Sequence, residues 1–269
     1  AHLSVGAGEV VGLVGANGAG KTTLIRVLQG LIPPTSGRVE LFGEPPSRAA
    51  RRRVGYVPQS LGLYPDLTVA ENLAFAAAAY GAPPPSLDEE LAAVRDRPVG
   101  QLPLGLQRRV AFAAAAGHRP ELLILDEPTS GVGPLGRARL WEDIRRAAED
   151  GAGVLVTTHY MREAEQCDRL VVLSSGRVVA EGTLDAILAG GSVASVRAER
   201  WQDAFRALRA AGFRLGLSGR TLRVVGAEPE RVRRALASAG VAAEVEPAPA
   251  TFEEAFLVLA PGPGRQGGG

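Results

Sequence analysis

One eight-residue segment constrains the fold of this chain more than any other feature. Residues 15–22 read Gly-Ala-Asn-Gly-Ala-Gly-Lys-Thr and satisfy the pattern Gly-x-x-x-x-Gly-Lys-Ser/Thr without a gap. An apolar run over residues 9–14 precedes the segment, and apolar residues with helical spacing follow it over residues 20–29. A strand, a glycine-rich loop and a helix in this order form a cradle for phosphate groups. The segment therefore predicts a nucleoside triphosphate site.

Each residue type in this loop has a physical reason. Glycines let successive backbone N–H groups converge on phosphate oxygens without obstruction by side chains. The following helix adds partial positive charge at its N-terminus. Lys21, the only lysine in the chain, supplies a full charge near the β- and γ-phosphates, the Thr22 hydroxyl can ligate Mg²⁺, and Thr23 can contact the α-phosphate. The predicted nucleotide-binding residues are Gly15, Ala16, Asn17, Gly18, Ala19, Gly20, Lys21, Thr22 and Thr23.

Two carboxylates follow an apolar run further along the chain. Residues 122–125 read Leu-Leu-Ile-Leu, and Asp126 and Glu127 come directly after them. In proteins with a phosphate-binding loop, an aspartate at this strand end holds Mg²⁺, usually through water. A glutamate beside it points towards the γ-phosphate, where it can accept a proton from the attacking water. Asp126 is therefore a predicted metal ligand, and Glu127 is the predicted catalytic base.

Two further polar residues follow predicted strands. His159 comes after the buried strand expected at residues 154–158, and a histidine there can hydrogen-bond the γ-phosphate and help to position the attacking water. Gln59 follows the strand expected at residues 53–57 and can reach Mg²⁺ or the same water. Taken alone, each has an ordinary structural interpretation. Beside the other motifs, we predict that both act in catalysis and that Gln59 is also a metal ligand.

Composition narrows the class of protein. A formal net charge of +1 gives no reason to expect nucleic acid or an anionic membrane surface as a partner. Cys167 is the only cysteine, which rules out an internal disulfide and fits a reducing cytosol. No segment approaches the ~18 consecutive apolar residues needed to cross a bilayer, and no secretory signal is evident. Any membrane-spanning part is expected on another chain.

The chain predicts an α/β domain followed by a smaller unit. Continuous apolar strands alternate with helical patterns in the first part, which indicates a mostly parallel sheet covered on both faces. The expected strands are residues 3–5, 9–14, 38–42, 53–57, 122–125, 154–158, 170–173 and 178–181, and the expected helices are 20–29, 69–80, 87–95, 105–117 and 135–149.

The pattern changes after Gly190. The order of predicted elements becomes β-α-β-β-α-β, the ferredoxin-like split pattern, and a closing helix follows at residues 252–259. The six elements are residues 192–198, 201–211, 213–217, 221–225, 229–239 and 241–245. We therefore predict a main domain over residues 1–189, an α+β accessory domain over 192–260 and a disordered Pro/Gly-rich tail over 261–269.

Four motifs stand in a fixed order along the chain: residues 15–22, Tyr56-Val57-Pro58-Gln59, Leu125-Asp126-Glu127-Pro128-Thr129-Ser130-Gly131 and Thr157-Thr158-His159. This set closely resembles the ATPase domain of ABC transporters over residues 5–188. The resemblance implies a P-loop NTPase fold with a helical subdomain.

No Asn-Lys-x-Asp motif for reading guanine is present, which favours ATP over GTP. The Thr-His-Tyr-Met and Glu-Ala-Glu-Gln-Cys-Asp sequences and the C-terminal extension resemble the branch that exports drugs, antibiotics and lipids.

The resemblance also implies a site that a partner completes. Such domains pair head to tail with two ATP molecules between them, and each site receives the partner's signature sequence, usually Leu-Ser-Gly-Gly-Gln. Gly105 is retained here, but Pro103 stands in place of the serine and Leu104 in place of a glycine, while Gly133 replaces an aspartate that bridges the subunits. The family's adenine-stacking aromatic would lie upstream of the first strand, before Ala1. The equivalent of the signature is Leu102, Pro103, Leu104, Gly105 and Leu106.

Two functions follow from these features as expectations. The first is an Mg-ATP-hydrolysing subunit, peripheral at the cytoplasmic face of the cell membrane, that powers export through a separate permease. The alternative is a nucleotide-gated regulatory subunit with little hydrolysis. Pro103 and Gly133 favour the alternative, whereas Glu127 and His159 argue against it, because a degenerate site commonly loses its base or its histidine. A soluble cassette acting on ribosomes or DNA usually has two cassettes or a coiled-coil insertion, and this sequence has neither.

Overall fold

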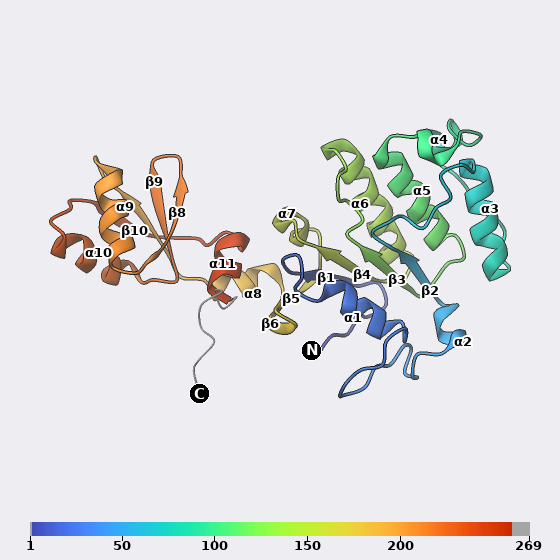
Figure 1. The fold of residues 1–269 in the computed structure, drawn as a ribbon, viewed down its shortest axis with the longest axis horizontal. Coiled ribbons are helices and arrows are strands. Elements are labelled where there is room, and N and C mark those ends of the chain that lie inside the picture. Colours follow the sequence, from blue (N-terminus) through green and yellow to red (C-terminus); the bar gives the residue numbers. More distant parts are fainter. Residues whose placement is uncertain (1, 260–269) are drawn as a thin grey trace. The chain divides into compact units, whose positions relative to one another are not determined.

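The computed structural model describes residues 2–259, and the chain divides into two compact units between Val178 and Val179 (Figure 1). That division comes before the boundary at Gly190 that the sequence suggests, and the predicted domain limits stay a prediction. The predicted tail, residues 261–269, and residue 260 lie outside the described residues.

The first unit is built on a six-stranded sheet in the order β2-β3-β4-β1-β5-β6, with β6 running across the point of division. The pairs β2·β3, β3·β4, β4·β1 and β1·β5 are all parallel, as predicted. Their register places Asp126 beside Thr157 and Val14 beside Thr158. The strands are β1 (Val10–Val14), β2 (Val54–Val57), β3 (Leu122–Asp126), β4 (Gly153–Thr158), β5 (Arg169–Ser174) and β6 (Arg177–Gly182).

Helices cover both faces of this sheet, which explains why its central strands are apolar up to their C-terminal ends, where Asp126, Thr157 and Thr158 stand. Helix α1 (Lys21–Leu28) buries Ile25 against Leu13 and Ile124 on one face. Helices α5 (Leu104–Ala116) and α6 (Pro134–Glu149) lie on the other side (Figure 1). Two-sided burial leaves no position in these strands for the polar residues of a half-exposed sheet.

A helical region formed by residues 63–116 carries its own small core. Helix α3 (Val69–Tyr80) begins with a capping box between Thr68 and Glu71 and packs on α5. Buried Arg109 of α5 joins this region to α6, because its guanidinium pairs with Asp88, Glu90 and Asp143. The remaining short helices are α4 (Glu89–Ala92) and the 3-10 helix η1 (Val99–Gln101).

Several expected elements differ in the structure. Residues 3–5 are not a strand, and residues 38–42 form only an isolated bridge between Leu41 and Glu44. Phe42 and Gly43 have φ values of 57° and 80°, so the chain turns back there instead of extending along a neighbouring strand. Helices α2 (Arg48–Arg51), α7 (Met161–Ala164) and α8 (Leu184–Ala189) are unexpected, since four to six residues give no measurable apolar period.

The second unit contains an antiparallel sheet in the order β10-β7-β9-β8. Its element order is the β-α-β-β-α-β order predicted from the sequence, and its core includes Val196, Leu208 and Leu222. After α8, the elements of this unit are β7 (Val193–Arg197), α9 (Trp201–Ala210), β8 (Arg214–Ser218), β9 (Thr221–Val225), α10 (Pro229–Ser238), β10 (Glu244–Ala248) and α11 (Phe252–Leu259).

The last strand of this sheet lies later in the chain than predicted, at residues 244–248 instead of 241–245. Gly240 has a φ of 67°, and the Val241 N–H donates to the Leu236 carbonyl at 3.0 Å. Val241 thus closes the C-terminus of α10 in the manner of a Schellman motif and is not available to the sheet. Within residues 2–259, every helix is too short or too polar to cross a bilayer.

Candidate nucleotide site

The loop between β1 and α1 needs glycine at several positions for different reasons. A Cβ on Gly15 would lie 2.5 Å from the Leu173 carbonyl oxygen, so only glycine lets the loop pass β5. Gly18 and Gly20 have φ values of 80° and 104°, a region that side-chain-bearing residues rarely adopt. The loop therefore turns tightly and places Lys21 at the first position of α1.

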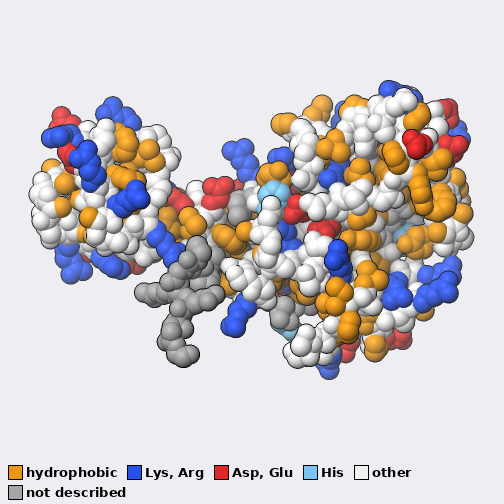
Figure 2. Space-filling model, in the orientation of Figure 1, with side chains coloured by type: hydrophobic (Ala, Val, Ile, Leu, Met, Phe, Trp, Pro, Cys, Tyr) orange, Lys and Arg blue, Asp and Glu red, His pale blue; other side chains and the backbone are white. Residues whose placement is uncertain are grey.

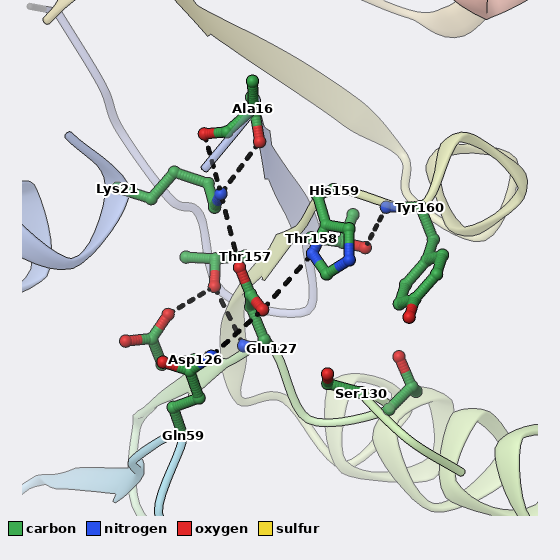
Figure 3. A network of polar contacts seen from close by, with 12 residues as sticks. Ala16, Lys21, Gln59, Asp126, Glu127, Ser130, Thr157, Thr158, His159 and Tyr160 are labelled. Atoms are coloured by element: carbon green, nitrogen blue, oxygen red, sulfur yellow. Dashed lines mark hydrogen bonds and ion pairs between the residues drawn. The ribbon is translucent and has the colours of Figure 1, made fainter. Parts of the chain in front are cut away.

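Lys21 is held inside the loop that carries it. Its side chain is only 5% exposed, and its Nζ donates to the carbonyls of Gly15 at 2.8 Å and Ala16 at 3.3 Å. The same ammonium lies 3.3 Å from Glu127 Oε1 (Figure 3). The one lysine of the chain thus stands between the phosphate loop and the candidate base.

Eight of the predicted residues line one cavity of about 310 Å³. Because that volume is at the lower end for ligand pockets, it suits the phosphate end of a nucleotide better than a whole one. A larger hollow of about 480 Å³ beside Asp88 and Arg139 contains none of the predicted residues. The smaller cavity is lined by Asn17, Gly18, Gly20, Lys21, Thr22, Thr23, Gln59 and Glu127.

Asp126 and Thr22 meet at the edge of this cavity. The Thr22 hydroxyl donates to Asp126 Oδ2 at 3.1 Å, and the Thr157 hydroxyl donates to Oδ1 at 2.6 Å. Carboxylate and hydroxyl oxygens are the hard ligands that Mg²⁺ prefers, with phosphate oxygens completing the shell. No cluster of three or more His, Cys, Asp or Glu able to hold a metal occurs among the described residues. The Thr22 hydroxyl and the Asp126 carboxylate fit a magnesium ion whose shell is completed by phosphate oxygens.

The other two predicted catalytic residues, Gln59 and His159, both lie beside the Glu127 carboxylate. Its Oε2 accepts a hydrogen bond from Gln59 Nε2 at 3.3 Å and lies 3.2 Å from His159 Nδ1, although that second contact lacks hydrogen-bond geometry (Figure 3). Its backbone N–H donates to the Thr157 hydroxyl at 2.9 Å. Glu127 also has a φ of 50°, an uncommon conformation for a residue other than glycine. Such strain is typical of functional positions, where the surrounding contacts hold it in place.

The signature segment lies apart from this cavity. Pro103 caps the N-terminus of α5, and Leu104, Gly105 and Leu106 form its first turn. A Cβ on Gly105 would lie 3.5 Å from Val132 Cγ1, so the segment packs beside the loop that follows Glu127. Leu104 is 38% exposed. The structure therefore brings together Lys21, Thr22, Gln59, Asp126, Glu127 and His159, and it does not bring Leu102–Leu106 to the same cavity.

Sequence reasoning missed a buried network behind His159. Glu163 is 2% exposed and accepts hydrogen bonds from the hydroxyls of Thr158, at 2.6 Å, and Thr129. The Thr158 hydroxyl in turn accepts the Tyr160 N–H at 2.9 Å. Glu163 thus links the loop after Glu127 to the segment that carries His159. The only sequence signal was a glutamate four residues after a candidate histidine.

Comparisons with known proteins agree with this geometry. Residues 1–130 match the protein family described as ABC transporter. Nod factor export ATP-binding protein I of Burkholderia lata is 40% identical over 273 residues, covering 96% of this chain and 90% of that protein. Probable multidrug ABC transporter ATP-binding protein YbhF of Escherichia coli is 40% identical over 200 residues, covering 70% of this chain and 35% of that protein.

Solved structures that resemble this chain are also ABC ATPases. The ATP-binding subunit of an ABC transporter is 34% identical with a TM-score of 0.61, covering 70% of this chain and 83% of that one. An ATP-binding cassette in a dimeric post-hydrolysis state, bound to ADP and Pi, is 25% identical with a TM-score of 0.58, covering 68% and 88%. The predicted α/β P-loop ATPase fold is thereby confirmed. Because full-length similarity accompanies this fold, the chain belongs to the ABC transporter family, as an ATP-binding and ATP-hydrolysing subunit of its export-like branch.

Proposed function

We propose that this chain is the motor subunit of an exporter and that Glu127 is its catalytic base. The observation that carries the proposal is the convergence on one carboxylate. Lys21, Gln59 and His159 all lie within 3.3 Å of a Glu127 oxygen, and Asp126 is the preceding residue. A buried carboxylate with these neighbours can order a water molecule and accept its proton.

Different residues of the site bind phosphate, hold the metal and activate water. The backbone of residues 15–20, the N-terminus of α1 and Lys21 bind the β- and γ-phosphates. Thr22, Asp126 and Gln59 would hold Mg²⁺, which would neutralise charge on those phosphates. Glu127 takes a proton from the water that attacks the γ-phosphorus, while the bond to the β-phosphate oxygen breaks. Gln59 and His159 orient that water.

Two partners belong to this proposal. A second ATPase subunit pairs head to tail and contributes its residues 102–106 to the other chain's ATP, a pairing that the dimeric relative supports. A membrane permease uses the energy, as the exporter names of the relatives suggest, and holds this chain at the cytoplasmic face of the membrane. Hydrophobic side chains gather over the region of α3 on the face shown in Figure 2. Phe75 of α3 and Tyr64 are 57% and 51% exposed, and their rings pack edge to face with centroids 5.2 Å apart, which offers an apolar contact.

One experiment separates the motor from the regulatory alternative that Pro103 and Gly133 favour. Phosphate release is measured at saturating Mg-ATP over a wide range of protein concentration, with the Glu127→Gln variant as control. A motor completed by its partner shows turnover per chain that rises with concentration and disappears in the variant. A regulatory subunit binds a fluorescent ATP analogue but releases phosphate no faster than Glu127→Gln at every concentration, also when reconstituted with its permease.

A further inference from the structure

Two adjacent arginines in α5 have the same burial but opposite surroundings. Arg108 and Arg109 are 6% and 5% exposed. Arg109 pairs with three carboxylates, as described above. Arg108 has no carboxylate within ion-pair distance in the described part of the chain. Its guanidinium donates instead to two main-chain carbonyls, Nη1 to Gln59 at 3.1 Å and Nη2 to Ser130 at 3.3 Å.

These surroundings are costly for a cation. Burial lowers the pKa of Arg108, the charge of Glu127 opposes this effect only in part, and the Arg108 Nε has no hydrogen-bond partner among residues 2–259. A buried charge without a counter-ion in contact is less stable than a neutral side chain of similar volume. Packing alone therefore gives no reason for arginine at this position. The role of this arginine then depends on the two main-chain carbonyls that its hydrogen bonds hold, those of Gln59 and Ser130.

Both acceptors belong to loops that carry the candidate base and its partner. Gln59 donates through its side chain to Glu127 Oε2 at 3.3 Å, while its carbonyl is held by Arg108. Ser130 donates its N–H to the Glu127 carbonyl at 3.2 Å and so closes the turn in which Glu127 has a positive φ. Figure 3 shows Gln59 and Ser130 near Glu127. One guanidinium thus fixes the backbone of both loops.

The position of Arg108 in its helix adds a second connection. Helix α5 begins at Leu104, so Arg108 is one turn later and on the same side of the helix. A displacement of the first turn of α5 therefore reaches Gln59 and Ser130 directly through this side chain. Arg109 lies one position further round the helix, and its carboxylate partners are elsewhere.

We propose that Arg108 is a positioning residue for ATP hydrolysis. It holds the Gln59 backbone and the Glu127–Ser130 turn in register with the start of α5, and it touches neither the nucleotide cavity nor the reacting atoms. The inference rests on the proposed role of Glu127 as base. It assigns to Arg108 the orientation of that base and its partner, and it leaves phosphate binding to the loop residues.

The test compares Arg108→Met, which keeps an unbranched apolar stem and loses all donors, with Arg108→Lys, which keeps a charged donor on a stem of similar length. Thermal unfolding, steady-state phosphate release and titration with a fluorescent ATP analogue are measured for each. We expect Arg108→Met to lower kcat about tenfold or more while KM and the analogue's Kd change by no more than about twofold. Arg108→Lys should recover part of the lost kcat even where its Tm equals that of Arg108→Met.

Two controls keep the outcome interpretable. Arg109→Met removes an equally buried arginine of the same helix and should lower Tm without the selective loss of kcat. Glu127→Gln reports on the base itself. If Glu127→Gln keeps full turnover, the proposed function is wrong. If Glu127→Gln is inactive but Arg108→Met is fully active, or its loss falls on KM, or Arg108→Lys gives no recovery, the role of Arg108 is wrong.

Discussion

Lys21 Nζ and Glu127 Oε1 lie 3.3 Å apart, with the two side chains 5% and 10% exposed. The cation of the phosphate loop is therefore paired with the candidate base, and neither charge is well solvated. We expect a γ-phosphate that enters the loop to compete with Glu127 for the same ammonium. Under the proposed function, nucleotide binding then frees the Glu127 carboxylate to bind water.

The first prediction concerns Lys21→Ala. We expect Mg-ATP binding to weaken by tenfold or more, since a hydrogen bond to a charged group contributes about 1.5–3 kcal/mol and this chain has no other lysine. Titration with a fluorescent ATP analogue measures the affinity, and Lys21→Arg is the control that keeps the charge. Equal affinity in Lys21→Ala and the parent would show that residues 15–22 do not bind phosphate.

The second prediction concerns Glu127→Gln, which keeps the shape of the side chain and removes the proton acceptor. A positioned base contributes about 10²–10⁴ in rate, so turnover should fall by that order while ATP still binds. The variant should accumulate as an ATP-bound dimer. Phosphate release and analytical ultracentrifugation measure the two effects. Full turnover in this variant would assign the base to another residue.

Motif residues are the part of the site that sequence alone could place. Asp126, Glu127 and His159 stand at or just after the ends of buried strands, and parallel strands bring their C-terminal ends to one edge of the sheet. That rule predicts their neighbourhood without any knowledge of side-chain geometry. It also explains the cavity, since the glycine loop follows β1 at the same edge. The α/β alternation that led to the fold class follows from the same burial.

Contacts between distant segments could not be predicted in this way. Arg108 meets Gln59 across 49 residues of sequence, and Thr129 meets Glu163 across 34. No period or motif marks such pairs, because their partners are chosen by tertiary packing. The strand expected at residues 38–42 failed for the complementary reason. The turn at Phe42 and Gly43 limits this segment to one isolated bridge.

The third prediction concerns the buried network behind His159. Glu163→Gln removes the charge that accepts from Thr158 and Thr129, and mispairing a buried acceptor costs about 1–3 kcal/mol. We expect a loss of that size in the free energy of unfolding, with ATP affinity changed by no more than about twofold. Denaturant unfolding measures the first quantity. Glu165→Gln, an exposed neighbour, is the control, and an equal stability loss in both would refute the network's importance.

The fourth prediction concerns acid stability of the second unit. Hydrogen bonds from Arg223, at 2.8 Å to each carboxylate oxygen, lower the pKa of Glu254 from its ordinary 4.5 to about 2. Because the folded pKa is below the unfolded one, this stabilisation is complete above pH 4.5 and is lost as pH falls towards 2. Glu254→Gln should therefore show a smaller loss of stability across that interval.

Fluorescence of Trp201 reports on this unit alone once Trp141 is replaced by phenylalanine. Thermal unfolding is then followed at several pH values for the parent, Glu254→Gln and the exposed neighbour Glu253→Gln. The parent and Glu253→Gln should lose stability in parallel as the pH falls. A Glu254→Gln profile with the same slope as theirs would mean that the Arg223 pair does not contribute to folding.

The last prediction concerns the altered signature. Pro103 has no backbone N–H and no side-chain donor, and the Leu106 N–H is already bonded to the Pro103 carbonyl at 2.9 Å. The donors that remain for a partner's ATP are the amides of Leu104 and Gly105 in the first turn of α5, with the helix N-terminus behind them. Losing one hydrogen bond to a charged group costs about 1.5–3 kcal/mol, or roughly tenfold or more in dimer affinity. We therefore expect the isolated chain to dimerise weakly with ATP.

In the Glu127→Gln background, Pro103→Ser with Leu104→Gly should strengthen the dimer seen by sedimentation with ATP. Pro103→Ala with Leu104→Gly, which opens the backbone without restoring the hydroxyl, should recover only part of that gain. Tight dimerisation of the parent segment, or a weaker dimer after the double change, would mean that residues 102–106 reach the partner's ATP in a different way.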